Sequence, residues 1–347
     1  MGKKSVNSSK YLSKAESFIV VFIIFSLYFW LNRENSYEKE PVLEEEPETV
    51  ENRAKNSENA AVFFDSDVQS IVKALIKESS EKIDIASYTY SKNEIVKLLE
   101  KKAKDGIQVR LAAGQNKDRS LPAFAFSNVR MKRGIYHPKF MVFDRKNVLI
   151  LSANISSETT SFNNAVLFRN VPVAAKILEH EIDDVFEGKI ERKCENGCSS
   201  EIGTIFFNPG KGCLNVKNEI LRAKKSIKAG VYTVTLKNPV VSGLKKAVKN
   251  GVKSSVIVDN WRGNDGSIVN KRAFKYLESL GADLSYDEDE ERNSRLFHHK
   301  FAEIDGSTVI FGSMNWTSAA CYKNREIVVI RKDEKLAEYF EDYFDSF

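Results

Sequence analysis

The chain carries one order of segments twice, and this internal repeat is the feature that most limits its fold. Residues 82–90 and 107–114 have the pattern of strands, and residues 93–106 between them have the pattern of a helix. Residues 226–260 repeat this order of strand, helix, glycine and strand. Strands joined by helices predict an α/β protein, so we expect two tandem halves with mixed, largely parallel sheets.

Each copy continues into a hairpin, a further strand and a closing helix. The halves are expected at residues 61–190 and 201–347, and the polar join at 188–201 contains glycine. We expect the two halves to pack face to face as a pseudo-dimer within one chain.

The hairpin of each half carries the same spaced set of polar residues. The second copy has the order H-x-K-x4-D followed by G-S-x-N, and the first copy repeats it with Leu151 in place of Gly312. Side chains alternate between the two faces of a strand, so the histidine and lysine of each copy share a face. The set comprises His137, Lys139, Asp144, Ser152 and Asn154 in the first copy, and His298, Lys300, Asp305, Ser313 and Asn315 in the second.

These residue types suit the chemistry of a phosphodiester. An imidazole is a nucleophile or a proton donor, and ammonium, hydroxyl and amide groups stabilise charge on phosphoryl oxygens. The alternative without a functional site is two unrelated surface hairpins, but the recurrence of a five-residue set argues against it. We therefore predict one site in which His137 and His298 come within reach of the same phosphate.

The two copies resemble the H-x-K-x4-D-x6-G-S-x-N motif of the phospholipase D superfamily. The stretch from His298 to Glu326 is most similar to the branch that contains mitochondrial cardiolipin hydrolases and Zucchini endonucleases. The resemblance covers residues 202–347 well and residues 60–187 more loosely. Members of that branch usually build one site across a homodimer, so two motifs in one chain imply a catalytic unit that can be monomeric.

The resemblance implies hydrolysis through a phosphohistidine, without a cofactor or a metal. One imidazole attacks phosphorus, and the other protonates the leaving oxygen and then activates water. The lysines Lys139 and Lys300 and the amides Asn154 and Asn315 would neutralise the phosphoryl oxygens, with Ser152 and Ser313 as supporting donors. Asp144 and Asp305 would be structural.

The halves are not equal in the residues that would orient the histidines. In the resembled family a glutamate at the position of Glu326 orients the motif histidine, which favours His298 as the oriented nucleophile. Counted from the motif asparagine, the position that matches Glu326 in the first half is Ala165. His137 therefore either lacks an orienting carboxylate or takes one from elsewhere. In the resembled family the histidine of the first motif is usually the nucleophile, so the choice between His137 and His298 stays open.

The N-terminal region differs in composition from the rest. Residues 1–16 form a basic tail, residues 17–32 contain the apolar run 18–31, and residues 33–60 are an acidic linker. We expect a single membrane anchor rather than a cleaved signal peptide or a buried helix. The resemblance implies the mitochondrial outer membrane, whereas the basic flank predicts a cytosolic N-terminus, and the endoplasmic reticulum is the alternative.

The cysteine count and the net charge set only wide limits on the chemistry. Four cysteines are too few for a disulfide scaffold, and we expect free thiols or one local disulfide in preference to zinc. A net charge of +5 permits an anionic substrate without identifying it.

Three functions remain open at this stage. The first is a membrane-bound hydrolase of a phospholipid such as cardiolipin. The second is a nuclease for single-stranded nucleic acid, for which Tyr88, Tyr90, Tyr232 and Trp316 are candidate stacking residues. The third is a phosphate-binding pseudoenzyme, which is suggested by Leu151 and Ala165, because both depart from the family motif in the first half.

Overall fold

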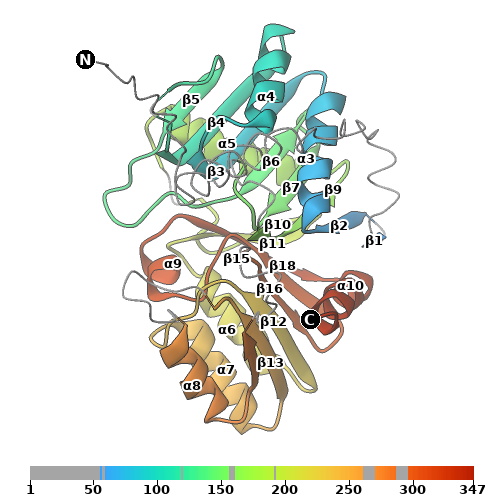
Figure 1. Cartoon of the computed structure of the whole chain (residues 1–347), viewed down its shortest axis with the longest axis vertical. Coiled ribbons are helices and arrows are strands. Elements are labelled where there is room, and N and C mark those ends of the chain that lie inside the picture. The colour runs from blue at the N-terminus through green and yellow to red at the C-terminus, as the bar shows by residue number, and fades with distance from the viewer. Residues whose placement is uncertain are drawn as a thin grey trace, which may run out of the picture. The chain divides into compact units, whose positions relative to one another are not determined.

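The computed structural model describes residues 55–56, 59–118, 120–155, 161–190, 193–260, 270–286 and 296–347. All of them belong to one compact unit, Glu45–Phe347. This unit contains two sheets of matching topology, each with its own helices, as expected from the repeat (Figure 1).

The first half is an eight-stranded sheet with the order β1-β2-β9-β7-β6-β3-β4-β5. Helices α3 and α4 cover one face of this sheet, and α5 covers the other. The strands are β1 (Lys55–Asn56), β2 (Ala60–Phe64), β3 (Lys82–Tyr90), β4 (Gln108–Asn116), β5 (Ala125–Asn128), β6 (Phe140–Phe143), β7 (Asn147–Leu151) and β9 (Asn164–Phe168), and the helices are α3 (Ser66–Glu78), α4 (Glu94–Lys104) and α5 (Pro172–Phe186).

The second half repeats this arrangement with the order β10-β11-β18-β17-β16-β12-β13-β14. Its strands are β10 (Cys198–Ser200), β11 (Gly203–Asn208), β12 (Ser226–Val231), β13 (Lys253–Val258), β14 (Asp283–Tyr286), β16 (Lys300–Ile304), β17 (Thr308–Gly312) and β18 (Glu326–Lys332). Its helices are α6 (Gly212–Arg222), α7 (Pro239–Lys249), α8 (Lys271–Glu278), α9 (Ser318–Tyr322) and α10 (Glu334–Asp345). A small parallel pair, β8 (Ser161–Phe162) with β15 (Leu296–Phe297), links the two halves.

The expectation of largely parallel sheets is wrong. Strands β3, β4 and β5 are parallel, as are β12, β13 and β14, but the other pairings within the two large sheets are antiparallel. The reason is the hairpin in each half, because a tight turn forces the next strand to run back. Asp144 and Asp305 occupy these turns with φ of 50° and 57°, a conformation that aspartate tolerates better than most residues.

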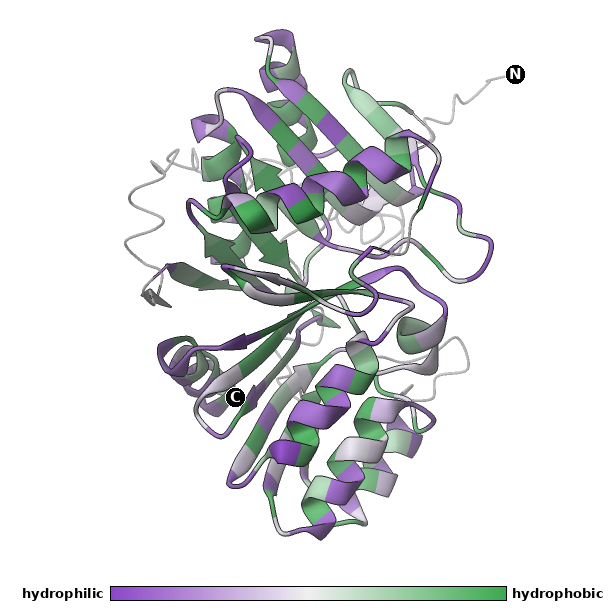
Figure 2. Ribbon diagram, turned by 180° about the vertical axis from the view of Figure 1, so that it is seen from behind, coloured by the Kyte–Doolittle hydropathy of each residue, from purple (hydrophilic) through white to green (hydrophobic). Residues whose placement is uncertain are grey.

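The helices have the two-sided pattern that the sequence predicts. In α3 the buried residues include Val68, Ile71, Val72 and Leu75, which follow the helical period. Figure 2 shows the resulting alternation of hydrophilic and hydrophobic positions along the helices. An asparagine caps the matching helix of each half: Asn93 accepts a hydrogen bond from the third residue of α4, and Asn238 does the same for α7.

One apolar cluster joins the halves. It takes residues from both sheets and from α5 and α10, with Phe168 and Phe311 stacked at a centroid distance of 6.2 Å. A fully buried ion pair between Arg325 and Glu181 crosses the same boundary. Breaking one partner of such a pair leaves an uncompensated buried charge, which costs about 3–5 kcal/mol. The two halves therefore form one body around a shared core.

All four cysteines are paired, which corrects the expectation of free thiols or one local disulfide. Cys194 and Cys198 form the local bridge, and Cys213 and Cys321 form a second one across 108 residues. The second bridge ties α6 to α9 in the core of the second half. No sequence rule reveals such a connectivity, because pairing depends on the tertiary fold.

The expected membrane anchor at residues 17–32 lies outside the described residues, as do the basic tail and most of the acidic linker. Among the described helices, none combines the length and the apolarity that crossing a bilayer requires.

Candidate active site

Both motifs lie at the start of a central strand. His137 and Lys139 precede β6, and His298 and Lys300 enter β16, so corresponding strands of the two sheets carry them. His137, Lys139 and Lys300 are buried, with 7%, 1% and 3% of their surface exposed, while His298 is half-buried. Strand β6 pairs with β3 and strand β16 pairs with β12, which fixes each motif against its own sheet.

Hydrogen bonds cross between the halves at the two histidines. The Nδ1 atom of His137 lies 2.6 Å from the Glu326 carboxylate of the second half. The Nδ1 atom of His298 lies 3.1 Å from the Oδ1 atom of Asn163 in the first half. The structure thus brings both motifs into one site, and it corrects the assignment of Glu326 to His298.

Asn163, not Ala165, is the counterpart of Glu326. Leu151 pairs with Ala165 in the first sheet, and Gly312 pairs with Val328 in the second, so Ala165 corresponds to Val328. Counting along the sequence failed because the connection from motif to strand is two residues shorter in the first half.

Leu151 in place of Gly312 has a local explanation. Gly312 has φ of 140°, and a Cβ there would lie 2.4 Å from the Ile327 carbonyl oxygen. Leu151 is not among the residues with positive φ, so a leucine fits the first copy without strain.

The motif serines hold the orienting residues, which corrects their assignment as donors to phosphate. The Ser313 hydroxyl donates to Glu326 at 2.6 Å and accepts from the backbone N–H of Ile327. The Ser152 hydroxyl donates to Asn163 at 3.0 Å and accepts from the backbone N–H of Asn164. Each serine therefore positions the side chain that contacts the histidine of the opposite half.

The motif aspartates bind backbone N–H groups at the far end of each hairpin. Asp144 accepts backbone hydrogen bonds from residues 80–82, and Asp305 accepts them from residues 224–226. Burial alone would raise the pKa of each carboxyl, but these N–H donors outweigh it and the pKa lies below its ordinary value. Both carboxylates brace the hairpin at the end away from the histidines.

The asparagines of the motifs differ in their partners. The Asn154 Oδ1 atom accepts a hydrogen bond from the Tyr88 backbone N–H at 3.2 Å. The buried Asn315 Oδ1 atom has no hydrogen-bond partner among the described residues.

Four basic side chains share this buried site, and each has a lowered pKa. Burial is the main cause for all four; it lowers the pKa of Lys139 to about 7 and that of His137 to about 4. For His298 and Lys300, burial and then the charges of neighbouring lysines hold the pKa well below its ordinary value. A phosphodiester anion would reverse part of these shifts, so the site is electrostatically suited to bind one.

An aromatic ring lies beside each motif. The ring of Tyr88 lies 5.2 Å from that of His137, and the ring of Tyr232 lies 4.9 Å from that of His298. Lys139 and Lys300 each place Nζ within 6 Å of the tyrosine of their own half. Tyr88 and Tyr232 therefore lie beside the motif residues, whereas the other two candidate stacking residues, Tyr90 and Trp316, are buried in apolar clusters.

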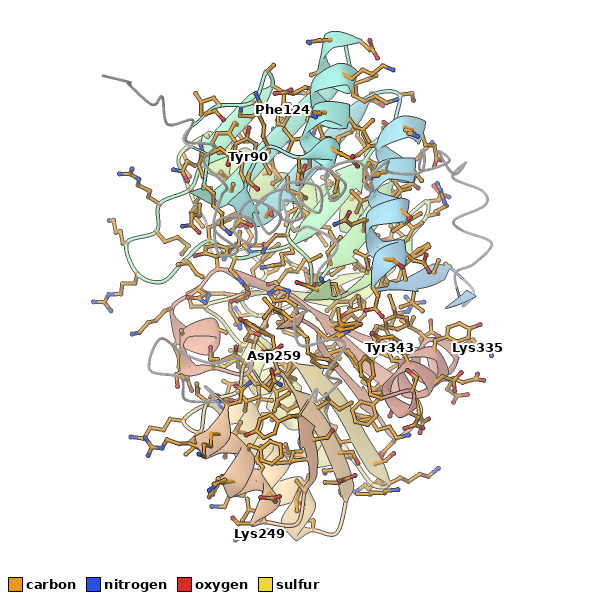
Figure 3. The ribbon with its side chains drawn as sticks, viewed as in Figure 1. Tyr90, Phe124, Lys249, Asp259, Lys335 and Tyr343 are labelled. Carbon is orange, nitrogen blue, oxygen red and sulfur yellow. A yellow bond between two sulfur atoms is a disulfide. The ribbon has the colours of Figure 1, made fainter. Side chains whose placement is uncertain are left out.

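Asp259 belongs to the site but was missed from the sequence. Its buried carboxylate accepts a 2.6 Å hydrogen bond from the Phe297 backbone N–H, next to His298. Burial and then the Asp259 charge raise the pKa of Tyr232 to about 12, and the same charge opposes the lowering of the Lys300 pKa. Figure 3 labels Asp259 just past the end of β13. An acidic residue directly after a buried strand was the available signal.

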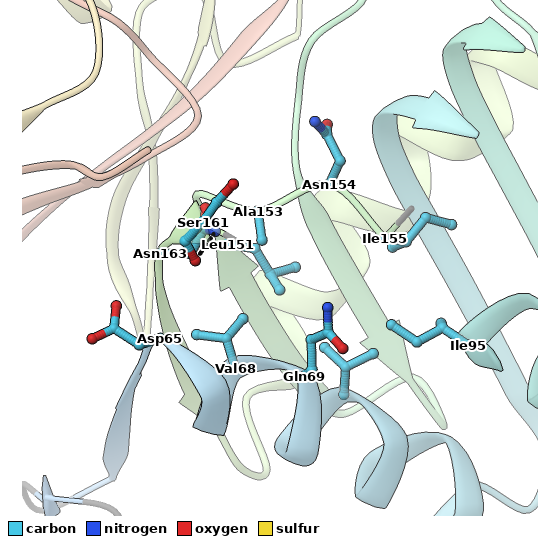
Figure 4. A pocket seen from close by; sticks show the side chains of 11 residues that line it. Asp65, Val68, Gln69, Ile95, Leu151, Ala153, Asn154, Ile155, Ser161 and Asn163 are labelled. Carbon is cyan, nitrogen blue, oxygen red and sulfur yellow. Dashed lines mark hydrogen bonds between the residues drawn. The ribbon is translucent and has the colours of Figure 1, made fainter. Parts of the chain in front are cut away.

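An apolar recess adjoins the site in the first half (Figure 4). Its walls come mainly from α3, α4 and the residues that follow β7, and Asn154 and Asn163 supply polar groups. The lining residues are Asp65, Val68, Gln69, Val72, Ile95, Leu151, Ala153, Asn154, Ile155, Ser161 and Asn163. In the second half the positions of Ala153 and Ile155 are taken by Met314 and Trp316, which are buried in the core.

Comparison with known families agrees with this geometry. The family described as "Cardiolipin synthase, PLD-like domain" matches residues 72–186 and 216–347. The chain belongs to this family. Its two matched segments coincide with the two halves and include both motifs.

Relatives of known name match less than half of the chain. A mitochondrial cardiolipin hydrolase of Xenopus tropicalis is 32% identical over 131 residues, which is 36% of this chain and 56% of the relative. A phospholipase D of Rickettsia conorii is 32% identical over 142 residues, 41% of this chain and 66% of the relative. The chain spans about half the length of the first of these relatives.

The fold of the whole unit also has a solved counterpart. The phosphatidylserine synthase of Haemophilus influenzae aligns with a TM-score of 0.64 over 85% of this chain and 88% of that chain, at 14% identity. This likeness shows that two tandem halves in one chain make the shared architecture.

Proposed function

We propose that this chain is a phosphodiesterase that uses His137 and His298 as a catalytic pair. The observation that carries the proposal is the crossed pair of hydrogen bonds, His137 with Glu326 and His298 with Asn163. Each bond fixes Nδ1 of its histidine and leaves Nε2 for the substrate. The pair thus has the geometry of a nucleophile and a proton donor held by groups that lie behind them.

His137 is the proposed nucleophile. The Glu326 carboxylate accepts a hydrogen bond from Nδ1–H and stabilises the positive imidazole that forms when Nε2 bonds to phosphorus. The bond between phosphorus and the leaving oxygen then breaks, and that oxygen takes a proton from Nε2 of His298. Water transfers a proton to His298 and attacks the phosphohistidine, which releases the phosphomonoester and restores His137.

The cationic residues stabilise the charge that builds on the phosphoryl oxygens. Lys139 and Lys300 are the proposed phosphate ligands, together with the amides of Asn154 and Asn315. Each amide would donate to these oxygens from Nδ2, because its Oδ1 atom can only accept a hydrogen bond.

The proposed substrate is a phospholipid such as cardiolipin. The names of the relatives support it. The alternative is a nuclease for single-stranded RNA or DNA. The tyrosines beside both motifs favour that alternative, since bases stack on aromatic rings.

We propose a single-pass membrane protein anchored by residues 18–31. The name of the first relative supports a mitochondrial location. Two disulfides are typical of a body that faces an oxidising compartment, which supports the alternative of the endoplasmic reticulum. Protease protection of sealed organelles, with and without detergent, tests on which side the body lies.

The decisive experiment gives purified protein either fluorescent cardiolipin or 5′-labelled single-stranded RNA and DNA, with EDTA present throughout. Release of a phosphatidyl product that His137→Asn and His298→Asn abolish supports the lipid substrate. Cleavage of oligonucleotides alone replaces it with the nuclease. Binding of phosphate analogues without turnover of any diester would establish a pseudoenzyme.

A further inference from the structure

A cationic surface lies beside the catalytic residues at the edge where the two halves meet. It is formed by the loop of residues 130–135 in the first half and by residues 322–324 in the second, which begin at the end of α9. We call it the cationic rim and define it by Arg130, Lys132, Arg133, Ile135, Tyr322 and Lys323.

Backbone contacts hold the two parts of the rim together. The Ile135 backbone N–H donates to the Asn324 side chain at 3.3 Å, and the Arg325 backbone N–H donates to the Ile135 carbonyl at 2.9 Å. Gly134 lies so close to Lys323 that a Cβ would meet the Lys323 carbonyl oxygen at 2.3 Å. The rim therefore has a fixed backbone, although its side chains are exposed.

The four cations of the rim have no ion-pair partner among the described residues. Arg130, Lys132, Arg133 and Lys323 are all exposed. Some other exposed cations of this chain, such as Arg145 and Lys335, pair with a glutamate. The rim thus concentrates unneutralised positive charge on one surface.

Two exposed apolar or amphipathic side chains stand among these cations. Tyr322 is 60% exposed and Ile135 is 37% exposed, and each neighbours rim cations along the chain. Soluble surfaces expose single apolar residues routinely, so neither residue is informative alone. Beside unpaired cations they form the combination that binds at the interface of an anionic bilayer.

The rim connects directly to the catalytic pair. Ile135 is two residues before His137, and Lys323 is three residues before Glu326. The His137 backbone N–H also donates to the Arg325 carbonyl at 2.9 Å, which ties the two segments at the site. A surface bound to the rim is therefore held at the entrance to the residues that contact phosphate.

We propose that the cationic rim docks the catalytic unit on an anionic phospholipid surface and presents a headgroup to His137 and His298. This inference rests on the proposed lipid substrate and names the surface from which it is taken. A nucleic acid also complements the cations, but Ile135 offers it neither a hydrogen bond nor a stacking face. The apolar member of the rim therefore favours the bilayer.

The test measures co-sedimentation of residues 45–347 with vesicles. This segment is one compact unit with all three apolar clusters, so it is expected to fold without the apolar run 18–31. Vesicles of phosphatidylcholine alone are compared with vesicles that contain 30% cardiolipin as the probe. We expect binding to the anionic vesicles only, and we expect it to weaken with salt.

The test variant is Arg130→Ala/Lys132→Ala/Arg133→Ala. Each cation near an anionic bilayer contributes roughly fivefold in affinity, so the triple variant should bind about 100-fold more weakly. The matched control removes three exposed lysines at the end of α7 and the start of β13, Lys246, Lys249 and Lys253, of which Figure 3 labels Lys249. The control variant should bind like the wild type.

A second variant, Ile135→Ser, separates a bilayer from a nucleic acid. It should weaken binding to anionic vesicles several-fold and leave binding to single-stranded oligonucleotides unchanged. Equal losses in the rim variant and in the lysine control would overturn the proposal, as would binding to oligonucleotides without binding to vesicles.

The outcome stays separate from that of the proposed function. Hydrolysis of a small soluble diester, bis-p-nitrophenyl phosphate, reports the catalytic pair, and the rim variants should leave its rate unchanged. Loss of vesicle binding with intact diester hydrolysis shows that the rim acts only in docking. Vesicle binding by a wild type that hydrolyses no diester would refute the enzyme and leave the docking surface standing.

Discussion

The Nδ1 atom of His137 lies 2.6 Å from the carboxylate of Glu326, a residue of the opposite half of the chain. The neutral amide of Asn163 occupies the matching place beside His298. Each histidine is thus oriented by the other half, but only one of the two orienting groups described carries a negative charge. This difference supports the unequal roles proposed for the two histidines.

Glu326→Gln should lower the rate of diester hydrolysis by about 10²–10⁴-fold, because the amide cannot stabilise a charged imidazole at His137. Substrate affinity should change little, since Glu326 lies behind the histidine. Steady-state kinetics on a soluble diester measure the change. A loss confined to KM would contradict the role given to Glu326.

Asn163→Asp should place a second carboxylate beside His298 and raise the pKa of that imidazole. If His298 donates the proton to the leaving group, it stays protonated to higher pH, and the alkaline limb of the pH–rate profile moves up by about one unit. Asn163→Ala is the control and should lower the rate without that shift. An alkaline limb that does not move in Asn163→Asp would reassign the proton donor.

Binding of sulfate should weaken as the pH rises above about 7. Burial lowers the pKa of Lys139 to about 7, so above this pH the lysine must take up a proton to pair with the anion. Sulfate keeps its charge over this range, and its affinity measured by calorimetry should fall by up to about tenfold per pH unit. Lys139→Arg, whose guanidinium stays charged, should extend tight binding to higher pH.

The same lysine should make stability depend on pH in alkaline solution. The folded state holds the pKa of Lys139 near 7, below the ordinary value of 10.5, so the unfolded chain binds more protons between these values. Its contribution to the free energy of unfolding therefore rises with pH from about 7 to about 10. Urea denaturation should show a smaller rise for Lys139→Met than for the wild type, and an equal rise would show that Lys139 is not responsible.

The two disulfides should contribute unequally to stability. The bridge from Cys213 to Cys321 closes 108 residues, which corresponds to about 5 kcal/mol in the chain-entropy model, against about 2 kcal/mol for the short loop from Cys194 to Cys198. Replacing each pair by alanines and measuring thermal unfolding tests this order. A larger loss from the local pair would contradict it.

Much of the fold could be predicted because it follows from local patterns. The period of apolar residues identified α3, α4 and α7, and the repeat identified two halves. Strand direction could not be derived from β-α-β units alone, because the hairpins at Asp144 and Asp305 reverse the chain after the parallel strands.

The members of the site were also predictable, whereas their partners were not. A motif gives the residue types on a strand, so both histidines and both lysines were found. Hydrogen bonds between halves depend on register across two sheets. Because one connection is two residues shorter in the first half, counting along the sequence pointed to Ala165 instead of Asn163. Asp259 escaped notice because it acts on the second motif from 38 residues away.

Having both motifs on one polypeptide frees them to diverge. In a symmetric pair of identical chains, every substitution appears in both half-sites, so a carboxylate exchanged for an amide would be exchanged twice. Here Glu326 and Asn163 are separate positions, and each can change while the other is kept. The fused architecture therefore permits division of labour between two histidines that symmetry would otherwise force to remain equivalent.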